Sequence, residues 1–197
     1  MLLTSIILAA GNSTRMGRDK ALMKIEGIAA VDMITNKLQE FSSKIIIVTG
    51  ANHQNLEEHL LNQNVEFVNN PQPEQGMFSS LKLALKVDAI SAYYLIHLID
   101  QPFIAQDTYQ TLVSAIDDHH QLFLPVLISQ NRTGHPLIVS PQVGGRILKA
   151  DVSENLRTII QSLPENIIKR IPVNDPNILD NINTPEQLKD KLTEIGI

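Results

Sequence analysis

Cysteine and tryptophan are absent from this 197-residue sequence, and long apolar runs are missing as well. Without cysteine there can be no disulfide framework, thiolate nucleophile or cysteine metal site. A membrane span needs roughly 20 consecutive apolar residues, whereas the apolar run at the start of the chain is interrupted at Thr4-Ser5. No Lys or Arg precedes that run, which argues against a signal peptide. We therefore expect a cytoplasmic protein that has no membrane partner.

Positive charge is also scarce. The chain has 16 Lys and Arg against 21 Asp and Glu, a net charge of −5. A general nucleic-acid-binding surface would favour a basic balance, so we expect no nucleic-acid partner. The length suffices for one sizeable core, and we expect a single domain over residues 1–197.

Apolar runs alternate with segments of helical periodicity along the whole chain. The runs that we expect to be strands cover residues 2–8, 44–49, 65–68, 93–99, 122–128, 136–139 and 167–173. The helical patterns cover residues 25–41, 54–63, a segment from about 78, 109–116, 142–149, 153–163 and a segment from 185. Such alternation predicts an α/β fold with three layers of Rossmann-like type, in which helices cover both faces of a mainly parallel sheet.

One loop after the first expected strand carries an unusual set of side chains. The stretch from Leu8 to Lys20 holds two glycines, two hydroxyls and three cations. Free backbone N–H groups in such a loop can cradle an anion, and Arg offers a planar fork that suits phosphate oxygens. The spacing fits neither the P-loop nor the dinucleotide fingerprint. From composition alone, a solvated strand-to-helix turn explains the stretch equally well.

Ligands of open α/β sheets collect beyond the carboxyl ends of the strands. That rule places residues 11–20, residues 76–80 and Asp100 at one edge of the sheet. Asp100 follows a buried strand, where its carboxylate could hold Mg²⁺ that bridges nucleotide phosphates. The alternative is an Asp that stabilises a turn beside Pro102.

The loop matches Leu-Ala-Ala-Gly-x-Ser-x-Arg-Met-Gly-x-x-Lys, and so resembles the signature of the molybdenum cofactor cytidylyltransferases and guanylyltransferases. Further pieces of the family pattern follow in order at residues 76–81, 100–102, 134–136 and 181–186. The resemblance covers nearly the whole chain. It implies a nucleotidyltransferase fold and a Mg²⁺-dependent transfer of an NMP group from a nucleoside triphosphate to a phosphorylated acceptor, with release of pyrophosphate.

The resemblance also implies roles for particular residues. Arg15, Lys20 and Asp100 would be catalytic, with Arg15 on the leaving phosphates and Lys20 on the α-phosphate. Mg²⁺ would be held by Asp100 and Asn183. The nucleotide would be bound by Leu8, Ala9, Ala10, Gly11, Ser13, Arg15, Gly17, Lys20, Gly76, Ser79 and Ser80. An acceptor pocket would be lined by Gly134, His135 and Pro136.

The chain departs from the family pattern in two places. Ile99 stands where the family usually has Gly before the Asp. Asn181 and Asn183 replace two carboxylates of the late motif; an amide oxygen can still ligate Mg²⁺ but adds no negative charge. Asp180 could substitute if the loop shifts. Alternatively, residues 181–184 are only a helix entry, in which Thr184 and Gln187 form a capping box.

Ala10 is typical of the cytidylyl type of loop, since the guanylyl type tends to have Gly there. We therefore expect CTP and molybdopterin as substrates, with a molybdoenzyme or its chaperone as a possible recipient of the product. The alternatives are GTP with molybdopterin, and cytidylyl or uridylyl transfer to a sugar or polyol phosphate. The two Asn residues also leave open a nucleotide-binding regulator without turnover.

Overall fold

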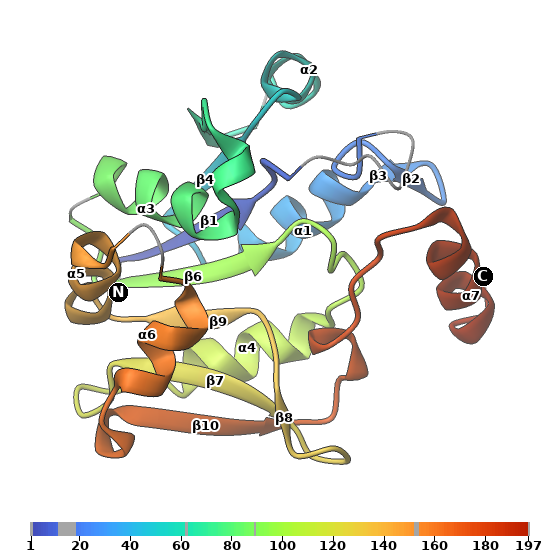
Figure 1. Ribbon diagram of the computed structural model, residues 1–197. Coiled ribbons are helices and arrows are strands. Elements are labelled where there is room, and N and C mark those ends of the chain that lie inside the picture. Colours follow the sequence, from blue (N-terminus) through green and yellow to red (C-terminus); the bar gives the residue numbers. More distant parts are fainter. Residues whose placement is uncertain (1, 12–18, 62, 89, 152–153, 197) are drawn as a thin grey trace.

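The computed structural model describes residues 2–11, 19–61, 63–88, 90–151 and 154–196 (Figure 1). The described chain forms a sheet of eight strands in the order β10-β7-β9-β6-β1-β4-β5, with β8 paired to β7. The strands are β1 (Leu3–Leu8), β4 (Lys44–Thr49), β5 (Glu66–Asn69), β6 (Tyr93–Leu98), β7 (Leu122–Leu127), β8 (Arg132–Thr133), β9 (Leu137–Val139) and β10 (Ile168–Val173). All strands except β8 and β9 run in one direction, which confirms the mainly parallel sheet.

Helices cover both faces of the sheet, as expected. The helices α1 (Ala30–Leu38), α2 (His53–His59) and α4 (Gln106–Ser114) pack on one face. The other face carries α3 (Met77–Val87), α5 (Pro141–Lys149) and α6 (Leu156–Ser162). Successive side chains of β1 point to opposite faces of the sheet. Ile7 packs in the core beneath α1, α2 and α4, and Ile6 packs in the core beneath α3, α5 and α6. Both are fully buried, which explains why apolar residues follow one another directly at the end of this strand.

The predicted helix over 25–41 is wrong at both ends. Residues before it form a small hairpin, β2 (Lys24–Ile25) and β3 (Ile28–Ala29), and Phe41 lies beyond the end of α1. The hairpin turn puts Glu26 and Gly27 at positive φ, 50° and 86°. Both central residues at positive φ are typical of a type I′ turn, for which Glu is an unusual first residue. The polar connection expected at 129–135 likewise contains the short strand β8.

The last helix, α7 (Pro185–Glu194), lies apart from the sheet, on the side of β2 and β3 (Figure 1). The predicted capping box is confirmed: the Thr184 side chain accepts from the Gln187 N–H, and Gln187 accepts from the Thr184 N–H. Leu188 packs with Ile25 of the hairpin and with Met23, which directly precedes it. Ile195, expected on the same apolar stripe, is 42% exposed because the helix ends before it.

The strand order reverses between β1 and β6. From β1 the chain proceeds through β4 and β5 toward one edge, and then returns to add β6 on the other side of β1. At such a reversal, the loops that leave the two neighbouring strands separate and open a crevice. Residues 9–11 after β1 and residues 99–101 after β6 flank this crevice.

Candidate active site

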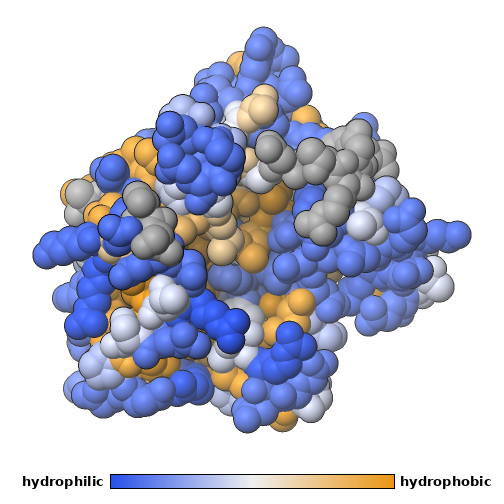
Figure 2. Space-filling view, in the orientation of Figure 1, coloured by the Kyte–Doolittle hydropathy of each residue, from blue (hydrophilic) through white to orange (hydrophobic). Residues whose placement is uncertain are grey.

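The crevice is a cleft of about 220 Å³ at the carboxyl ends of β1 and β6. Its walls come from the end of β1, the entry to α3 and the end of β6, together with Lys20. The lining residues are Leu8, Ala10, Gly11, Lys20, Pro73, Gly76, Met77, Ser80, Leu98, Ile99 and Asp100. In the space-filling view this face is hollowed near its centre, and apolar residues show in the floor (Figure 2). The structure therefore brings Gly11 and Lys20, at the two described ends of the first loop, together with Gly76 and Asp100, as the sequence predicted.

Three of the predicted nucleotide-binding residues, Ser13, Arg15 and Gly17, lie outside the described residues. Among the described ones, Ala9 does not line the cleft. Ala9 is only 2% exposed and packs in the core. Ile99, which replaces the usual Gly of the family, does line the cleft, although it is only 9% exposed and also packs in the core.

Asp100, Lys20 and Asn183 meet at one end of the cleft. The Lys20 Nζ donates to the Asn183 Oδ1 at 2.6 Å and lies 3.9 Å from the Asp100 Oδ2. Burial raises the pKa of Asp100, while the charge of Lys20 opposes that rise. Sequence reasoning placed all three residues at the site but missed the Lys20–Asn183 contact. Lys20 and Asn183 are 163 residues apart in the sequence, and no local pattern indicates that they are in contact.

The second carboxylate oxygen of Asp100, Oδ1, is buried and has no hydrogen-bond partner among the described residues. A buried carboxylate oxygen without a partner is unfavourable unless a cation or donor meets it. This carboxylate oxygen and the amide oxygen of Asn183 are both hard oxygen donors of the kind that Mg²⁺ prefers. In the described part of the chain no three His, Cys, Asp or Glu residues cluster as a metal site. These residues therefore fit a metal that nucleotide phosphates help to bind, rather than an all-protein cage.

Asn183 reaches the cleft because its loop is bonded to the end of β6. The Ile182 N–H donates to the Asp100 backbone carbonyl at 2.8 Å. On the other side, the Asn183 N–H donates to the Gln187 Oε1 at 2.7 Å, so the start of α7 also fixes this residue. Asp180, the suggested substitute ligand, is engaged elsewhere: its carboxylate accepts from Lys191 Nζ at 2.8 Å.

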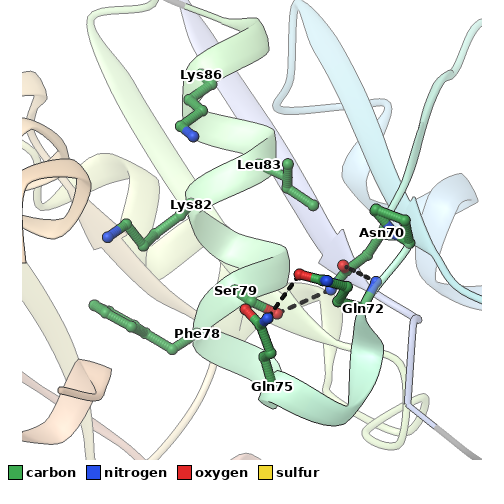
Figure 3. Close-up of a pocket in the computed structure, with 9 residues that line it drawn as sticks. Asn70, Gln72, Gln75, Phe78, Ser79, Lys82, Leu83 and Lys86 are labelled. Carbon is green, nitrogen blue, oxygen red and sulfur yellow. Dashed lines mark hydrogen bonds between the residues drawn. The ribbon is translucent and has the colours of Figure 1, made fainter. Parts of the chain in front are cut away.

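Residues of α3 and of the loop before it line a second hollow of about 260 Å³, which Figure 3 shows. Ser80 lines the cleft, whereas Ser79 lines the second hollow. Both hydroxyls accept from the Nδ2 of Asn70, at 2.9 Å each. Asn70 is 3% exposed and was missed by sequence reasoning, which treated residues 69–76 as a polar loop. Gly76 is the N-cap residue of α3 and has a φ of 87°, which favours glycine.

The predicted acceptor segment lies beside the late loop. A Cβ at Gly134 would clash with the backbone oxygen of Ile178, so only glycine allows this close approach. The His135 N–H donates to the same oxygen at 3.1 Å, and a cis peptide bond joins His135 to Pro136. Gln101, next to Asp100, also donates to the Ile178 carbonyl, at 3.1 Å. The segment thus adjoins the Asp100 turn, although none of its three residues lines the cleft described above.

A buried histidine that sequence reasoning did not single out lies nearby, on β6. His97 is fully buried, and its Nε2 pairs with the Tyr109 hydroxyl at 2.7 Å. Burial lowers the pKa of His97 to about 3, with a further contribution from His135. Burial also lowers the pKa of His135 to about 4. Both residues are therefore neutral near pH 7.

These pKa values predict acid destabilisation. Between about pH 6.5 and the lowered pKa of about 3, the unfolded chain binds a proton at His97 that the folded chain does not. Stability should therefore fall by about 1.4 kcal/mol per pH unit from this residue as the pH drops through that window. Urea unfolding at about pH 7, 6 and 5 should show a shallower pH dependence for His97→Gln than for the wild type. Parallel curves would contradict the assignment.

The model of the MobA-like NTP transferase domain matches residues 5–167. The chain belongs to this family. It is 29% identical over 194 residues to the molybdenum cofactor cytidylyltransferase of Escherichia coli, covering 96% of this chain and 97% of that protein. It is 24% identical over 198 residues to a probable molybdenum cofactor guanylyltransferase of Bacillus cytotoxicus, covering 95% of each. The predicted nucleotidyltransferase family is thereby confirmed.

Solved structures confirm the fold. The structure of 4-diphosphocytidyl-2C-methyl-D-erythritol synthase from Anaerococcus prevotii superimposes with a TM-score of 0.79 at 14% identity, covering 100% of this chain and 96% of that one. At this identity the likeness concerns the fold alone. In the described part of the chain, no helix is long and apolar enough to span a membrane.

Proposed function

We propose that this protein transfers an NMP group from a nucleoside triphosphate onto the phosphate of a molybdopterin-type acceptor and releases pyrophosphate. The observation that carries the proposal is the convergence of Gly11, Lys20, Gly76 and Asp100 on one cleft at the reversal of strand order. The names of the relatives support the acceptor, because both the cytidylyl and the guanylyl relatives act on the molybdenum cofactor.

In this mechanism an oxygen of the acceptor phosphate attacks the α-phosphorus in line, and pyrophosphate leaves. The backbone at Gly11 faces the phosphates, and Lys20 meets the charge that builds up on them. Asp100 and Asn183 would hold Mg²⁺, which when bound would supply positive charge to the phosphate oxygens. The acceptor already carries an ionised phosphate, so no strong general base is needed. The neutral, hydrogen-bonded His97 agrees with that requirement.

A direct test is to incubate the protein with molybdopterin, Mg²⁺ and either CTP or GTP, and to analyse the pterin by mass spectrometry. The proposal predicts a product heavier by one nucleoside monophosphate, and an equal amount of pyrophosphate. Transfer only to a sugar or polyol phosphate under the same conditions would replace the acceptor in the proposal while keeping the reaction type. A molybdoenzyme or its chaperone is the recipient that we propose for the product.

We favour CTP over GTP. Ala10 lines the cleft, and the cytidylyltransferase of Escherichia coli shares 29% identity with this chain, against 24% for the Bacillus cytotoxicus guanylyl relative. CTP with Mg²⁺ should therefore raise the melting temperature more than GTP at equal concentration, since tighter binding to the folded state stabilises it more. A panel of CTP, GTP, ATP and UTP tests this. A larger shift with GTP would make the guanylyl alternative the better description.

A further inference from the structure

A lysine outside the cleft holds the loop that follows Asp100. Lys37 lies in the last turn of α1, and its Nζ donates to the backbone oxygens of Pro102 at 3.1 Å and Ile104 at 2.8 Å. The side chain is half-buried, and burial lowers the pKa of Lys37 while Asp175 opposes that shift. A charged donor on two carbonyls of one short loop restrains that loop strongly, because charge-assisted hydrogen bonds are stronger than neutral ones.

Asp175 restrains the same loop from the other side. It is 6% exposed, and its Oδ2 accepts from the Ala105 N–H and the Thr108 hydroxyl, at 2.8 Å each. Ala105 is the N-cap residue of α4 and has no side-chain cap of its own. The Asp175 carboxylate therefore caps α4 from a distant part of the sequence. Its Oδ1 accepts from the backbone and the side chain of Asn177.

Residues 100–105 and residues 175–182 lie side by side in opposite directions and are joined by hydrogen bonds at three points. Ala105 is bonded to Asp175, the Gln101 side chain to the Ile178 carbonyl, and the Asp100 carbonyl to the Ile182 N–H. The next residue after Ile182 is Asn183, whose side chain contacts Lys20 in the cleft. The position of Asn183 relative to Asp100 is thus set by the way in which residues 175–182 lie along residues 100–105.

We propose that Lys37 and Asp175 are positioning residues, which fix the loop 100–105 and so hold Asp100 and Asn183 in the arrangement that binds the metal–nucleotide complex. This inference rests on the proposed function for the role of those two oxygen donors. Neither residue lines the cleft, so both act through the backbone of the loop.

The test compares Lys37→Met with a matched control. Lys169 makes the same kind of contacts at the opposite end of α4: its Nζ donates to the Ala115 carbonyl and to Asp117, at 2.8 Å each. Amide hydrogen exchange is measured first, without nucleotide or metal. In Lys37→Met the Ile182 and Ala105 amides should exchange about tenfold faster, because local opening of the loop is easier. In Lys169→Met those two amides should exchange as in the wild type.

The second measurement is the Mg²⁺ concentration that gives half-maximal pyrophosphate release. This Mg²⁺ concentration should rise severalfold in Lys37→Met, because the two oxygen donors are no longer held in place. It should stay unchanged in Lys169→Met, even if that variant is less stable, because a smaller folded fraction lowers the maximum rate without moving the half-saturation point. Lys37→Arg, which keeps a charged donor, should have a Mg²⁺ requirement close to that of the wild type. If Lys37→Met does not fold, Asp175→Asn replaces it, with the same results expected.

Unchanged exchange at Ile182, or faster exchange to the same extent in Lys169→Met, would overturn the inference. An unaltered Mg²⁺ requirement in Lys37→Met would overturn it as well. Absence of pyrophosphate release from the wild type would contradict the proposed function instead, and the exchange rates would still show whether Lys37 holds the loop.

Discussion

Asp100→Asn should lower pyrophosphate release by about a hundredfold or more. Asp100 supplies negative charge at the end of the cleft, where Lys20 lies between its carboxylate and the neutral amide of Asn183. The asparagine keeps the shape of the side chain but offers only a neutral oxygen to a cation. The loss should persist at high Mg²⁺ concentration, because charge as well as affinity is missing.

The same variant should fold as well as the wild type. Burial raises the pKa of Asp100, which shows that the surroundings disfavour its charged form, so removing the charge should not lower the melting temperature. Asp118→Asn, an exposed position outside the cleft, serves as the control and should keep full activity. Wild-type turnover by Asp100→Asn would remove Asp100 from the mechanism.

Lys20→Met should also reduce turnover by about a hundredfold, since removing one preorganised positive group from a phosphoryl-type transition state has an effect of that size. Lys20 is 18% exposed at its side chain and already lies against both proposed metal ligands. Methionine keeps the length of the chain without its charge. The rate should be followed by pyrophosphate release at saturating nucleotide, so that weaker binding does not hide a loss in the chemical step.

Two controls accompany this variant. Lys24→Met changes an exposed lysine of the hairpin outside the cleft and should behave like the wild type. Lys20→Arg keeps the charge and should retain more activity than Lys20→Met. If Lys20→Met turned over at the wild-type rate, the contact with Asn183 would be structural and Lys20 would have no part in the reaction.

The central strands β1, β4 and β6 were predictable because they are short, mainly apolar and buried on both faces. In β4, four successive β-branched residues at 45–48 predicted a strand over residues 44–49, and the structure has the strand at these bounds. The capping box of α7 was readable for a similar reason, since Thr184 and Gln187 are close in sequence and act locally. Features that depend on local patterns were therefore predicted well.

Features that depend on tertiary contacts were not. The hairpin β2–β3 is stabilised by packing between Met23, Ile25 and the distant Leu188, and its turn has no glycine or asparagine at the first central position. The role of Asn70 rests on two hydroxyls nine and ten residues away. Periodicity carries no information on such contacts.

The site was predicted in part. The strand-end rule predicted Lys20 and Asp100 at one edge of the sheet, and the resemblance implied Asn183 as a second metal ligand. In the structure Lys20 lies against both Asp100 and Asn183. The sequence contains no indication that Asn183 accepts a hydrogen bond from Lys20, or that Asp180 is bonded to Lys191 instead. Those partners depend on how the loop before α7 lies against the end of β6, which follows from backbone hydrogen bonds rather than from residue types.

The measurement that tests the central claim most directly is pyrophosphate release by the wild type with CTP, Mg²⁺ and molybdopterin, with nucleotide-induced thermal shifts recorded on the same samples. The account predicts pyrophosphate in amounts equal to the acceptor consumed, none without acceptor, and a loss of release in Asp100→Asn. A protein that is stabilised by nucleotide but releases no pyrophosphate with any acceptor or nucleoside triphosphate would contradict the account, and would be a nucleotide-binding regulator.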